Sequence, residues 1–472
     1  MRKILNKLLT IMLSSILLFS LISCSKEKNI DTCSLCNIVE PATKITYEPL
    51  EEFKPSLFDK DSFKVSQKTD LADGAYVDKI TLNLNNGNHV IVNAVNVDLN
   101  KVSIKAGTAK NSTQIITKAT PYQQVLDYEK ANENETVLAA VNADFFSSMP
   151  INAFVKDGVI IKDSHNDNGL YDYKDEKADL PASMPMLFGI SSSNKQAQIG
   201  AIVDNKSVEE TVKTKFKYQL DFLKTCTLDD KDKTSVNNVS LNASSTKKNE
   251  INFIMNKKVK LRPGKLIKVV LDENSIVKHG KIIEIVDVLE SSFLEASSDF
   301  AYILIPENID IKLEVGNYVA FYVNSVGDKW KHYDTVIGAR HALVINGEIP
   351  KSVALEYSNG AKRTNVPRTA VGIKEDGSVV VITIESLRYY NISKDEKDSY
   401  GVNLPELAEI MRYYGCVMAC NFDGGGSTNM LIKEPNKDLA VWTRSADYGS
   451  YNLGKARPVI NTLLVVKEKN EI

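Results

Sequence analysis

The sequence predicts an α+β fold, in which a mixed α/β sheet core contains a βαβ unit and carries a large β-rich insertion. Two observations predict this fold. Apolar residues recur at helical spacing over 404–414, between short apolar or β-branched runs at 378–384 and 416–422, which is the pattern of a βαβ unit. From about 196 to 330 the chain shows many short strand-like runs separated by charged turns, and no long helical pattern.

The composition is that of a folded protein large enough for more than one core. The chain has 472 residues, of which 43% are hydrophobic and 25% are charged, and its net charge is −2 at pH 7. Because proteins that bind nucleic acid normally present a basic surface, this charge balance argues against nucleic-acid partners. Outside the N-terminus no apolar run reaches 18 residues, so the mature chain is not predicted to span a membrane.

The N-terminus is predicted to be a lipoprotein signal peptide over residues 1–23. Basic residues near the start precede an apolar run at 8–19, and a small residue stands directly before Cys24. We expect cleavage before Cys24 and lipid attachment to it, which would anchor the protein to the cell membrane, facing outward on the extracellular or periplasmic side. An uncleaved anchor, or secretion without a lipid, is the alternative.

Residues 24–71 are polar and aperiodic, and are predicted to form a tether or linker. Within this segment Cys33 and Cys36 have the spacing of half a zinc site. Since no second pair of ligands lies nearby, we interpret them as a local disulfide or as two idle thiols. The folded domain is predicted over 72–467, interrupted by the β-rich insertion at about 196–330.

The domain is predicted to begin with a hairpin, a helix and a strand. Alternating or β-branched runs at 76–84 and 90–99 are separated by Asn-Asn-Gly-Asn, which is a hairpin signature. A helical pattern over 121–131 follows. An apolar strand at 136–141 then runs into Asn-Ala-Asp-Phe-Phe at 142–146.

The insertion is predicted to consist of short strands with solvated turns. Its segment 231–250 is rich in Ser, Thr, Asn and Lys, and is the strongest candidate for disorder. The predicted strands are at 251–254, 266–271, 281–288, 302–305 and 318–323.

Core character returns at Val336. A buried strand closes in an Asn-Gly turn at 346–347, and a hairpin of two strands then leads to the βαβ unit. Asn403 and Glu406 have the spacing of a capping box at the start of the predicted helix. The last apolar strand is predicted at 462–466.

Asp423 begins the sequence Asp-Gly-Gly-Gly-Ser directly after the predicted strand at 416–422. Glycine loses the most backbone freedom on folding, so three in a row indicate unusual dihedral angles or a close approach to a ligand. A carboxylate, a row of amide donors and two hydroxyls would suit an oxyanion such as a phosphate ester. A flexible surface turn is the alternative. The candidate phosphate-binding groups are Gly424, Gly425, Gly426, Ser427 and Thr428.

Two carboxylates are predicted at one rim of the sheet. Parallel strands of one sheet end at the same edge, so Glu385 and Asp423 should project from it, roughly 5–10 Å apart. That interval covers the carboxylate separations of glycosidases. Arg368 and Arg457 could reach the same rim and bind a phosphate through forked hydrogen bonds, or each could form a surface ion pair.

Five motifs, taken together and in this order, make the chain resemble the phosphodiester glycosidase family. The resemblance covers about 72–467, interrupted by the insertion. It departs from the family pattern at 385–388, Glu-Ser-Leu-Arg, where the family typically has Asp-Gly-Arg before the helix. The motifs are NADFF (142–146), PRTAVG with a following DG (367–377), LPELAEIM (404–411), ACNFDGGGST (419–428) and RPVIN (457–461).

The resemblance implies hydrolysis of the bond between a sugar's anomeric carbon and a phosphodiester oxygen, with release of free sugar and a phosphomonoester. Asp423 or Glu385 would act as nucleophile or as the base for water. The arginines and the glycine turn would stabilise the departing phosphate. The hydroxyls of the sugar would be held by Asn142, Asp144 and Asn421.

No cofactor is predicted, although Asp144 and Asp423 could share a divalent cation. The expected partners are a sugar phosphodiester or a cell-wall, capsular or exopolysaccharide glycan, together with the membrane through the lipid on Cys24. Two other classes of function stay open. The chain could be a lipid-anchored protein that binds glycans without catalysis, or a structural envelope protein that binds a partner through its insertion.

Overall fold

The computed structural model describes most of the chain after the N-terminal segment. The predicted signal peptide, the lipidation site Cys24 and the Cys33–Cys36 pair lie outside the described residues. No helix in the described part of the chain has both the length and the apolarity needed to cross a membrane. The described residues are 45–114, 116–163, 186–201, 215–226, 231–271, 278–325, 330, 332–351, 353 and 365–469.

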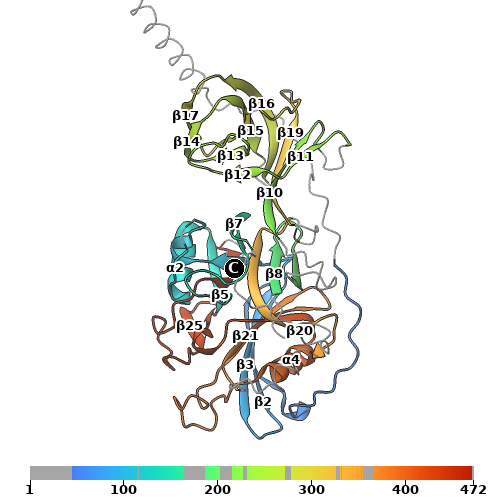
Figure 1. The fold of residues 1–472 in the computed structure, drawn as a ribbon. Helices are drawn as coiled ribbons and strands as arrows, with labels where there is room; N and C mark the ends of the chain where they lie inside the picture. The colour runs from blue at the N-terminus through green and yellow to red at the C-terminus, as the bar shows by residue number, and fades with distance from the viewer. Residues whose placement is uncertain are drawn as a thin grey trace, which may run out of the picture.

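Strands dominate the molecule, which has a lower body and a barrel-shaped upper part (Figure 1). The lower body contains an eleven-stranded sheet, in which β8 (Met186–Ser191) pairs with β20 (Thr335–Val344) and with β9 (Gln196–Ala201). The main path of this sheet is β1 (Lys64–Ala72), β2 (Ala75–Asn83), β3 (His89–Val97), β22 (Val379–Ile384), β21 (Arg368–Lys374), β23 (Cys416–Phe422), β20 (Thr335–Val344), β6 (Phe154–Lys156) and β7 (Val159–Lys162).

A five-stranded sheet shares the core of the lower body with the larger one. Val371 and Phe422 of the larger sheet belong to the same buried cluster as Leu138 and Leu463 of the smaller sheet. Burial of this shared apolar surface holds the two sheets together. The order of the smaller sheet is β25 (Leu439–Thr443), β24 (Met430–Lys433), β5 (Glu135–Asn142), β26 (Thr462–Glu468) and β4 (Ser103–Gly107).

Two α-helices pack on the other faces of these sheets. In α2 (Pro121–Ala131), Val125 and Tyr128 pack with residues of the smaller sheet. In α4 (Leu404–Tyr413), Leu407 and Ile410 pack with residues of the larger sheet. Each helix therefore buries one apolar face, as its spacing of apolar residues predicts.

The ends of α4 are built as predicted. The Asn403 side chain accepts a hydrogen bond from the Glu406 amide at 2.9 Å, and the Glu406 carboxylate accepts one from the Asn403 amide at 2.9 Å, which completes the capping box. Gly415 follows the helix with φ of 96°, a conformation that favours glycine at the C-terminal end of a helix.

The predicted crossover is confirmed. Strands β22 and β23 are both antiparallel to β21, which lies between them, so they run parallel to each other in one sheet and α4 connects them. They are next-nearest neighbours.

The predicted α+β class is wrong. The described residues form 26 strands and two α-helices, so the fold is predominantly β. The βαβ unit is one local feature of a mainly antiparallel structure. Several antiparallel pairs are joined by short turns, for example β1 to β2 and β21 to β22, and antiparallel pairs need no helix between them.

The fold also begins earlier than predicted. Residues 64–72 form β1, and Phe58 is 2% exposed in the core beneath α4. The amides of Ser56 and Leu57 each donate to the Glu409 carboxylate at 2.8 Å. The described part of the predicted tether is therefore packed onto the domain.

The upper part in Figure 1 is an eight-stranded sheet with a two-stranded addition, β14 (Lys258–Leu261) and β17 (Ser292–Glu295). The strands predicted for the insertion are present. The disorder predicted for 231–250 is wrong, because β11 (Thr234–Val236) and β12 (Val239–Leu241) lie within this segment. The sheet order is β11 (Thr234–Val236), β10 (Phe216–Leu223), β19 (Tyr318–Ser325), β16 (Lys278–Val288), β15 (Gly264–Leu271), β18 (Ala301–Pro306), β13 (Ile251–Met255) and β12 (Val239–Leu241).

Trp330 joins the upper part to the lower body. It is fully buried in a cluster that contains Phe216 and Val323 of the upper sheet and Leu187 of the lower one. An added Cβ at Gly189 would lie 2.7 Å from the Trp330 ring, so only glycine leaves room for it there. The hairpin β8–β9 belongs to the lower sheet, and the described strands of the upper sheet therefore lie between 216 and 325.

Candidate active site

Glu385 and Asp423 leave the same edge of the larger sheet. Within the sheet, Arg368 pairs with Ile384 of β22, and Thr369 pairs with Phe422 of β23. Each acidic residue follows the end of its strand directly. Two strand spacings separate β22 from β23, so the two positions lie roughly 10 Å apart along the sheet edge.

The glycine turn is short and tightly held. Gly425 to Ser427 form a 3-10 helix, in which the Ser427 and Thr428 amides donate to the carbonyls of Gly424 and Gly425 at 3.3 and 3.2 Å. The Gly425 amide donates to the Pro367 carbonyl at 2.9 Å. Two of the amides expected to face a phosphate, those of Gly425 and Ser427, are therefore used inside the protein, and so is the Thr428 amide.

An ion pair lies directly over Gly426. The Arg457 guanidinium donates to the Asp447 carboxylate through two hydrogen bonds of 2.7 and 2.8 Å, and the Ser445 hydroxyl donates to the Gly426 carbonyl at 2.5 Å. A Cβ added to Gly426 would overlap both charged groups of the pair. This close approach explains why a glycine stands here.

Gly426→Ala is expected to displace the Asp447–Arg457 pair and to lower kcat/KM on a sugar phosphodiester about tenfold, because a charge-assisted bond is lost. Gly425→Ala is the matched control. Its added Cβ meets open space, but its φ of 61° makes alanine strained by about 1 kcal/mol. We expect the control to lose stability and to keep its phosphate affinity. Equal kinetic losses in both variants would show that the ion pair has no special role.

Asp423 is a half-buried carboxylate among positive charges. Burial raises its pKa to about 6, while the Ser427 hydroxyl and the Arg457 and Arg340 guanidinium groups oppose this rise. The Asp423 amide donates to the Ala143 carbonyl at 2.9 Å, which fixes the main chain at the end of β23. At neutral pH the carboxylate is therefore mostly ionised, and its pKa is placed for acid–base chemistry.

Asp144 is the second carboxylate beside this site. Burial raises its pKa to about 8, Asn152 and Lys162 lower it, and the charge of Asp423 raises it further. Its Oδ1 accepts from Asn152 Nδ2 at 3.4 Å. A Cβ added to Gly338 would lie 2.6 Å from Asp144 Oδ2, so this glycine lets the carboxyl group pack against β20. The two acids therefore hold different protonation states near pH 7.

Glu385 is held by an arginine that the sequence did not point to. Its Oε1 accepts from the Arg444 amide at 2.6 Å, and its Oε2 accepts from Arg444 Nη2 at 2.9 Å. Arg444 also donates to Asp398 at 2.8 Å, and its guanidinium lies 4.6 Å from the centre of the Tyr451 ring. Both oxygens of Glu385 are thus engaged in a largely buried ion pair.

Glu385→Ala is expected to lower the free energy of unfolding by about 3 kcal/mol, because it leaves the largely buried Arg444 without its main partner. Glu385→Gln should lose less, since it keeps the shape and one acceptor oxygen. Urea unfolding of both variants measures this order. If Glu385→Gln abolished turnover while the unfolding midpoint stayed unchanged, Glu385 would be a catalytic group and not an anchor for Arg444.

Asn142 fastens the smaller sheet to the glycine turn. Its Nδ2 donates to the Asp423 carbonyl at 2.6 Å, and its Oδ1 accepts from the Thr369 hydroxyl at 2.9 Å and from the Asn429 amide at 3.1 Å. Thr428 is buried beside them, 3.4 Å from the Thr369 hydroxyl. These side chains position the site, and Asn142 has its hydrogen bonds satisfied within the protein.

Two other predicted binding residues differ in what surrounds them. Asn421 is 1% exposed, and its Oδ1 has no hydrogen-bond partner among the described residues. Arg368 Nε donates to the Val402 carbonyl at 3.2 Å, and its positive charge lowers the pKa of Glu406, which burial raises. Arg368 therefore lies at the predicted rim, oriented toward the start of α4.

Sequence reasoning missed Arg340, Arg444 and Asp447. Arg340 and His341 interrupt a mostly apolar strand, and this interruption is a signal that was available in the sequence. The register between β20 and β23 shifts at His341, whose φ is 48°, so that Arg340 pairs with Asn421 next to Asp423. Nothing local marks Arg444 or Asp447, because their partners come from distant parts of the chain.

Within the described ranges, no group of three or more His, Cys, Asp or Glu side chains is arranged to hold a metal ion. Asp144 and Asp423 are close enough for their carboxyl groups to interact, since the negative charge of Asp423 raises the pKa of Asp144. A cation shared by this pair stays an open alternative to the predicted absence of a cofactor.

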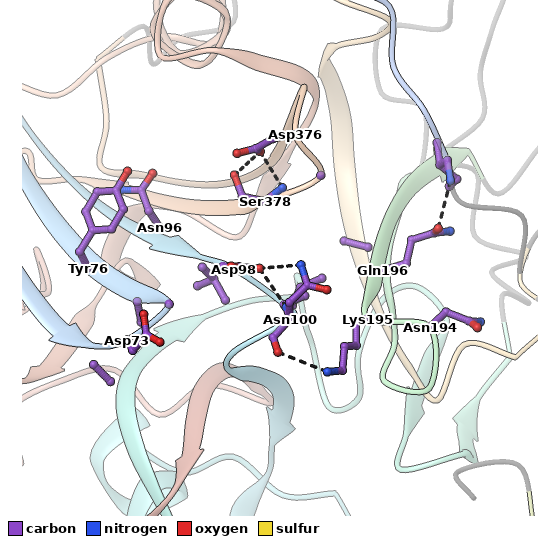
Figure 2. A pocket seen from close by; sticks show the side chains of 18 of the residues that line it. Asp73, Tyr76, Asn96, Asp98, Asn100, Asn194, Lys195, Gln196, Asp376 and Ser378 are labelled. Carbon is purple, nitrogen blue, oxygen red and sulfur yellow. Dashed lines mark hydrogen bonds between the residues drawn. The ribbon is translucent and has the colours of Figure 1, made fainter. Parts of the chain in front are cut away.

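A cavity of about 930 Å³ opens at the other end of the larger sheet (Figure 2). Its lining includes Tyr76, Asn96, Gln196 and Asp376. Asp376 lies in the turn between β21 and β22, at the end of these strands opposite the rim that carries the acids. The candidate active site is instead a surface site, in which the Arg457 side chain is 42% exposed.

Residues 302–466 match the model of the phosphodiester glycosidase family. This stretch includes Arg340, Glu385, Asp423 and Arg457, while Asp144 precedes it. No curated protein matches the chain.

Three solved structures are similar to the chain at low identity. A hypothetical protein from Synechocystis has a TM-score of 0.42 and 15% identity, and the match covers 84% of this chain and 62% of that protein. A Burkholderia pseudomallei protein, provisionally described as exported, has a TM-score of 0.39 and 15% identity, and the match covers 80% of this chain and 74% of that protein. The third is the catalytic domain of zebrafish N-acetylglucosamine-1-phosphodiester alpha-N-acetylglucosaminidase, auto-inhibited by its pro-peptide. It has a TM-score of 0.36 and 11% identity, and the match covers 88% of this chain and 96% of that one.

Proposed function

We propose that this chain, whose residues 302–466 carry a phosphodiester glycosidase domain, hydrolyses the bond between the anomeric carbon of a sugar and a phosphodiester oxygen. The observation that supports this most is the Asp423 carboxylate, which stands beside two guanidinium groups at the end of β23 within the matched region. A carboxylate can act at the anomeric carbon, and guanidinium groups suit the phosphate.

Arg457 and Arg340 would stabilise the charge of the leaving phosphate. Both lie close enough to lower the pKa of Asp423, and Arg457 is partly exposed in its pair with Asp447. A phosphate is a good leaving group, so charge stabilisation matters more here than protonation of the leaving oxygen. Because three amides of the glycine turn donate to groups within the protein, the arginines would provide most of the stabilisation of the phosphate charge.

Asp423 supplies the carboxylate for the reaction at the anomeric carbon, as the nucleophile or as the base for water. In the second case a water oxygen bonds to that carbon while its proton passes to Asp423. The bond from carbon to oxygen breaks, and its electron pair stays on the phosphate. The products are the free sugar and a phosphomonoester.

Asp144 and Glu385 would have supporting roles. Asp144, with its pKa raised to about 8 by burial, stays protonated at neutral pH and adds no negative charge beside Asp423. Glu385 holds Arg444 in place through its ion pair. We therefore propose that Asp423 carries out the reaction, while Asp144 and Glu385 maintain the shape and charge of the site around it.

The substrate we propose is a phosphodiester-linked glycan of the cell envelope, such as a wall polymer, capsule or exopolysaccharide. The lipoprotein-like N-terminus supports this location, because a lipid on Cys24 would hold the domain on the outer side of the membrane. The surface position of the site supports a large substrate.

Incubation with a panel of sugar-1-phosphodiesters tests the proposal. We expect reducing sugar to appear with at least one member, with and without EDTA. Loss of activity on chelation, restored by a divalent cation, would show that the metal-free account is wrong. Affinity for phosphoglycans without any release of sugar would favour the glycan-binding alternative.

A further inference from the structure

Three exposed tyrosines gather on two loops beside the candidate active site. Tyr390, Tyr448 and Tyr451 are 38%, 50% and 61% exposed, and we call them the tyrosine patch. The loop of Tyr390 follows β22, and the loop of the other two follows β25. Exposed aromatic side chains that cluster at one place commonly mark a binding surface.

The two loops are fastened to each other. Arg444, from the second loop, binds Asp398 of the first at 2.8 Å. A Cβ on Gly449 would overlap the Ile392 side chain, so the loops pack closely there. The patch is therefore one surface formed by two segments of chain.

Contacts around the tyrosine patch hold two of its rings in place. The Tyr451 ring lies over the Arg444 guanidinium, whose carbon is 4.6 Å from the ring centre. Tyr390 packs edge-on against Tyr389, which packs in the same way against Tyr400, with ring centres 5.4 and 5.7 Å apart. Rigid aromatic rings lose little entropy when a ligand covers them.

The patch adjoins the phosphate-binding arginine. Tyr448 directly follows Asp447, whose ion pair with Arg457 is the main cause that raises the pKa of that guanidinium. Tyr390 makes the smallest contribution to the same shift, so it lies near Arg457. A phosphodiester held by Arg457 would therefore place the next sugar of its chain over the tyrosines. Sugar rings present apolar C–H faces that pack on aromatic rings, and tyrosine hydroxyls can bond to sugar hydroxyls.

We propose that the tyrosine patch binds the sugar residues that continue from the cleaved phosphodiester, so that the substrate is a glycan chain and not an isolated sugar phosphodiester. This inference rests on the proposed function and adds to it a binding surface for the sugars beyond the cleaved bond. The occupant is a glycan of uncharged sugars joined through phosphodiester links, since the arginines receive the phosphate and the patch itself offers aromatic rings.

A comparison of two substrates tests the patch. One is a poly(N-acetylhexosamine 1-phosphate) chain, and the other is its single-repeat methyl diester. We expect Tyr448→Ala to lower the ratio of kcat/KM for the polymer to kcat/KM for the single repeat about tenfold, the loss of one aromatic packing contact. Tyr448→Phe should keep the ratio, because the ring is retained. Phe293→Ala is the control, because Phe293 is an aromatic side chain of the insertion that is also well exposed, at 68%.

Binding of the labelled polymer separates this inference from the proposed function. If the wild type binds the polymer and Tyr448→Ala binds it about tenfold more weakly, the patch is supported even when no sugar is released, and only the proposed hydrolysis fails. If the ratio and the affinity are the same in wild type and Tyr448→Ala, the inference is wrong. The same holds if Phe293→Ala loses as much as Tyr448→Ala.

Discussion

Asp423→Asn is expected to lower kcat/KM on a sugar-1-phosphodiester by about a thousandfold. The variant keeps the shape of the side chain but can neither attack the anomeric carbon nor accept a proton from water, and a loss of this size is usual for such a group. Steady-state release of reducing sugar measures the effect. In the wild type the activity should fall as the pH drops through about 6, where Asp423 takes up a proton.

The matched control for this loss is Asp376→Asn. Asp376 lies in the turn between β21 and β22, at the far end of the sheet, so its replacement should leave turnover within about twofold of the wild type. Turnover by Asp423→Asn at the rate of the control would show that another group performs the chemistry.

Asp144→Asn is expected to change how the stability depends on pH. Burial raises the pKa of Asp144 from 3.8 to about 8, so between these values the folded protein holds a proton that the unfolded chain releases. This stabilising effect is complete below pH 4 and is lost as the pH rises toward 8. The wild type should lose up to about 1.4 kcal/mol of unfolding free energy per pH unit relative to Asp144→Asn, or roughly 6 kcal/mol over the whole window.

Urea unfolding of the two proteins at several pH values between 4 and 9 measures this difference. The Asp376→Asn variant serves again as the control, because the pKa of Asp376 is lowered and its effect is confined to acid pH. Parallel curves for the wild type and Asp144→Asn across the window would mean that Asp144 is ionised in the folded protein, against the assignment made here.

The unit of β22, α4 and β23 could be predicted because its signals are local. The capping box of Asn403 and Glu406, the helical spacing and Gly415 all act within one turn of helix. The hairpin β2–β3 and the helix at 121–131 were predicted for the same reason. Such signals reveal individual elements, whereas the partners of each strand depend on distant residues.

The overall class could not be predicted in this way. One βαβ unit indicated a mixed architecture, but the larger sheet is assembled mainly from antiparallel pairs, including β3 with β22, which are 282 residues apart at Val97 and Val379. The packing of residues 45–63 was missed because polar, aperiodic segments can still be held by a few contacts, such as those of Glu409.

For the site, the sequence identified positions better than roles. The prediction that Glu385 and Asp423 leave one edge followed from strand direction alone, and the structure has this arrangement. The ion pair between Arg444 and Glu385 and the approach of Arg340 to Asp423 could not be predicted, because they depend on side-chain contacts between distant segments. The turn amides were predicted to face the ligand, but a tight 3-10 turn satisfies several of them internally.

Hydrolysis in ¹⁸O-labelled water tests the central claim most directly. The wild-type protein is incubated with a sugar-1-phosphodiester that it cleaves, and both products are analysed by mass spectrometry. Attack at the anomeric carbon places the label on the sugar and leaves the phosphomonoester unlabelled, which is the result we predict. Label in the phosphomonoester would mean attack at phosphorus, and absence of cleavage across the whole panel would mean that the site has no glycosidase activity; either result would contradict the account.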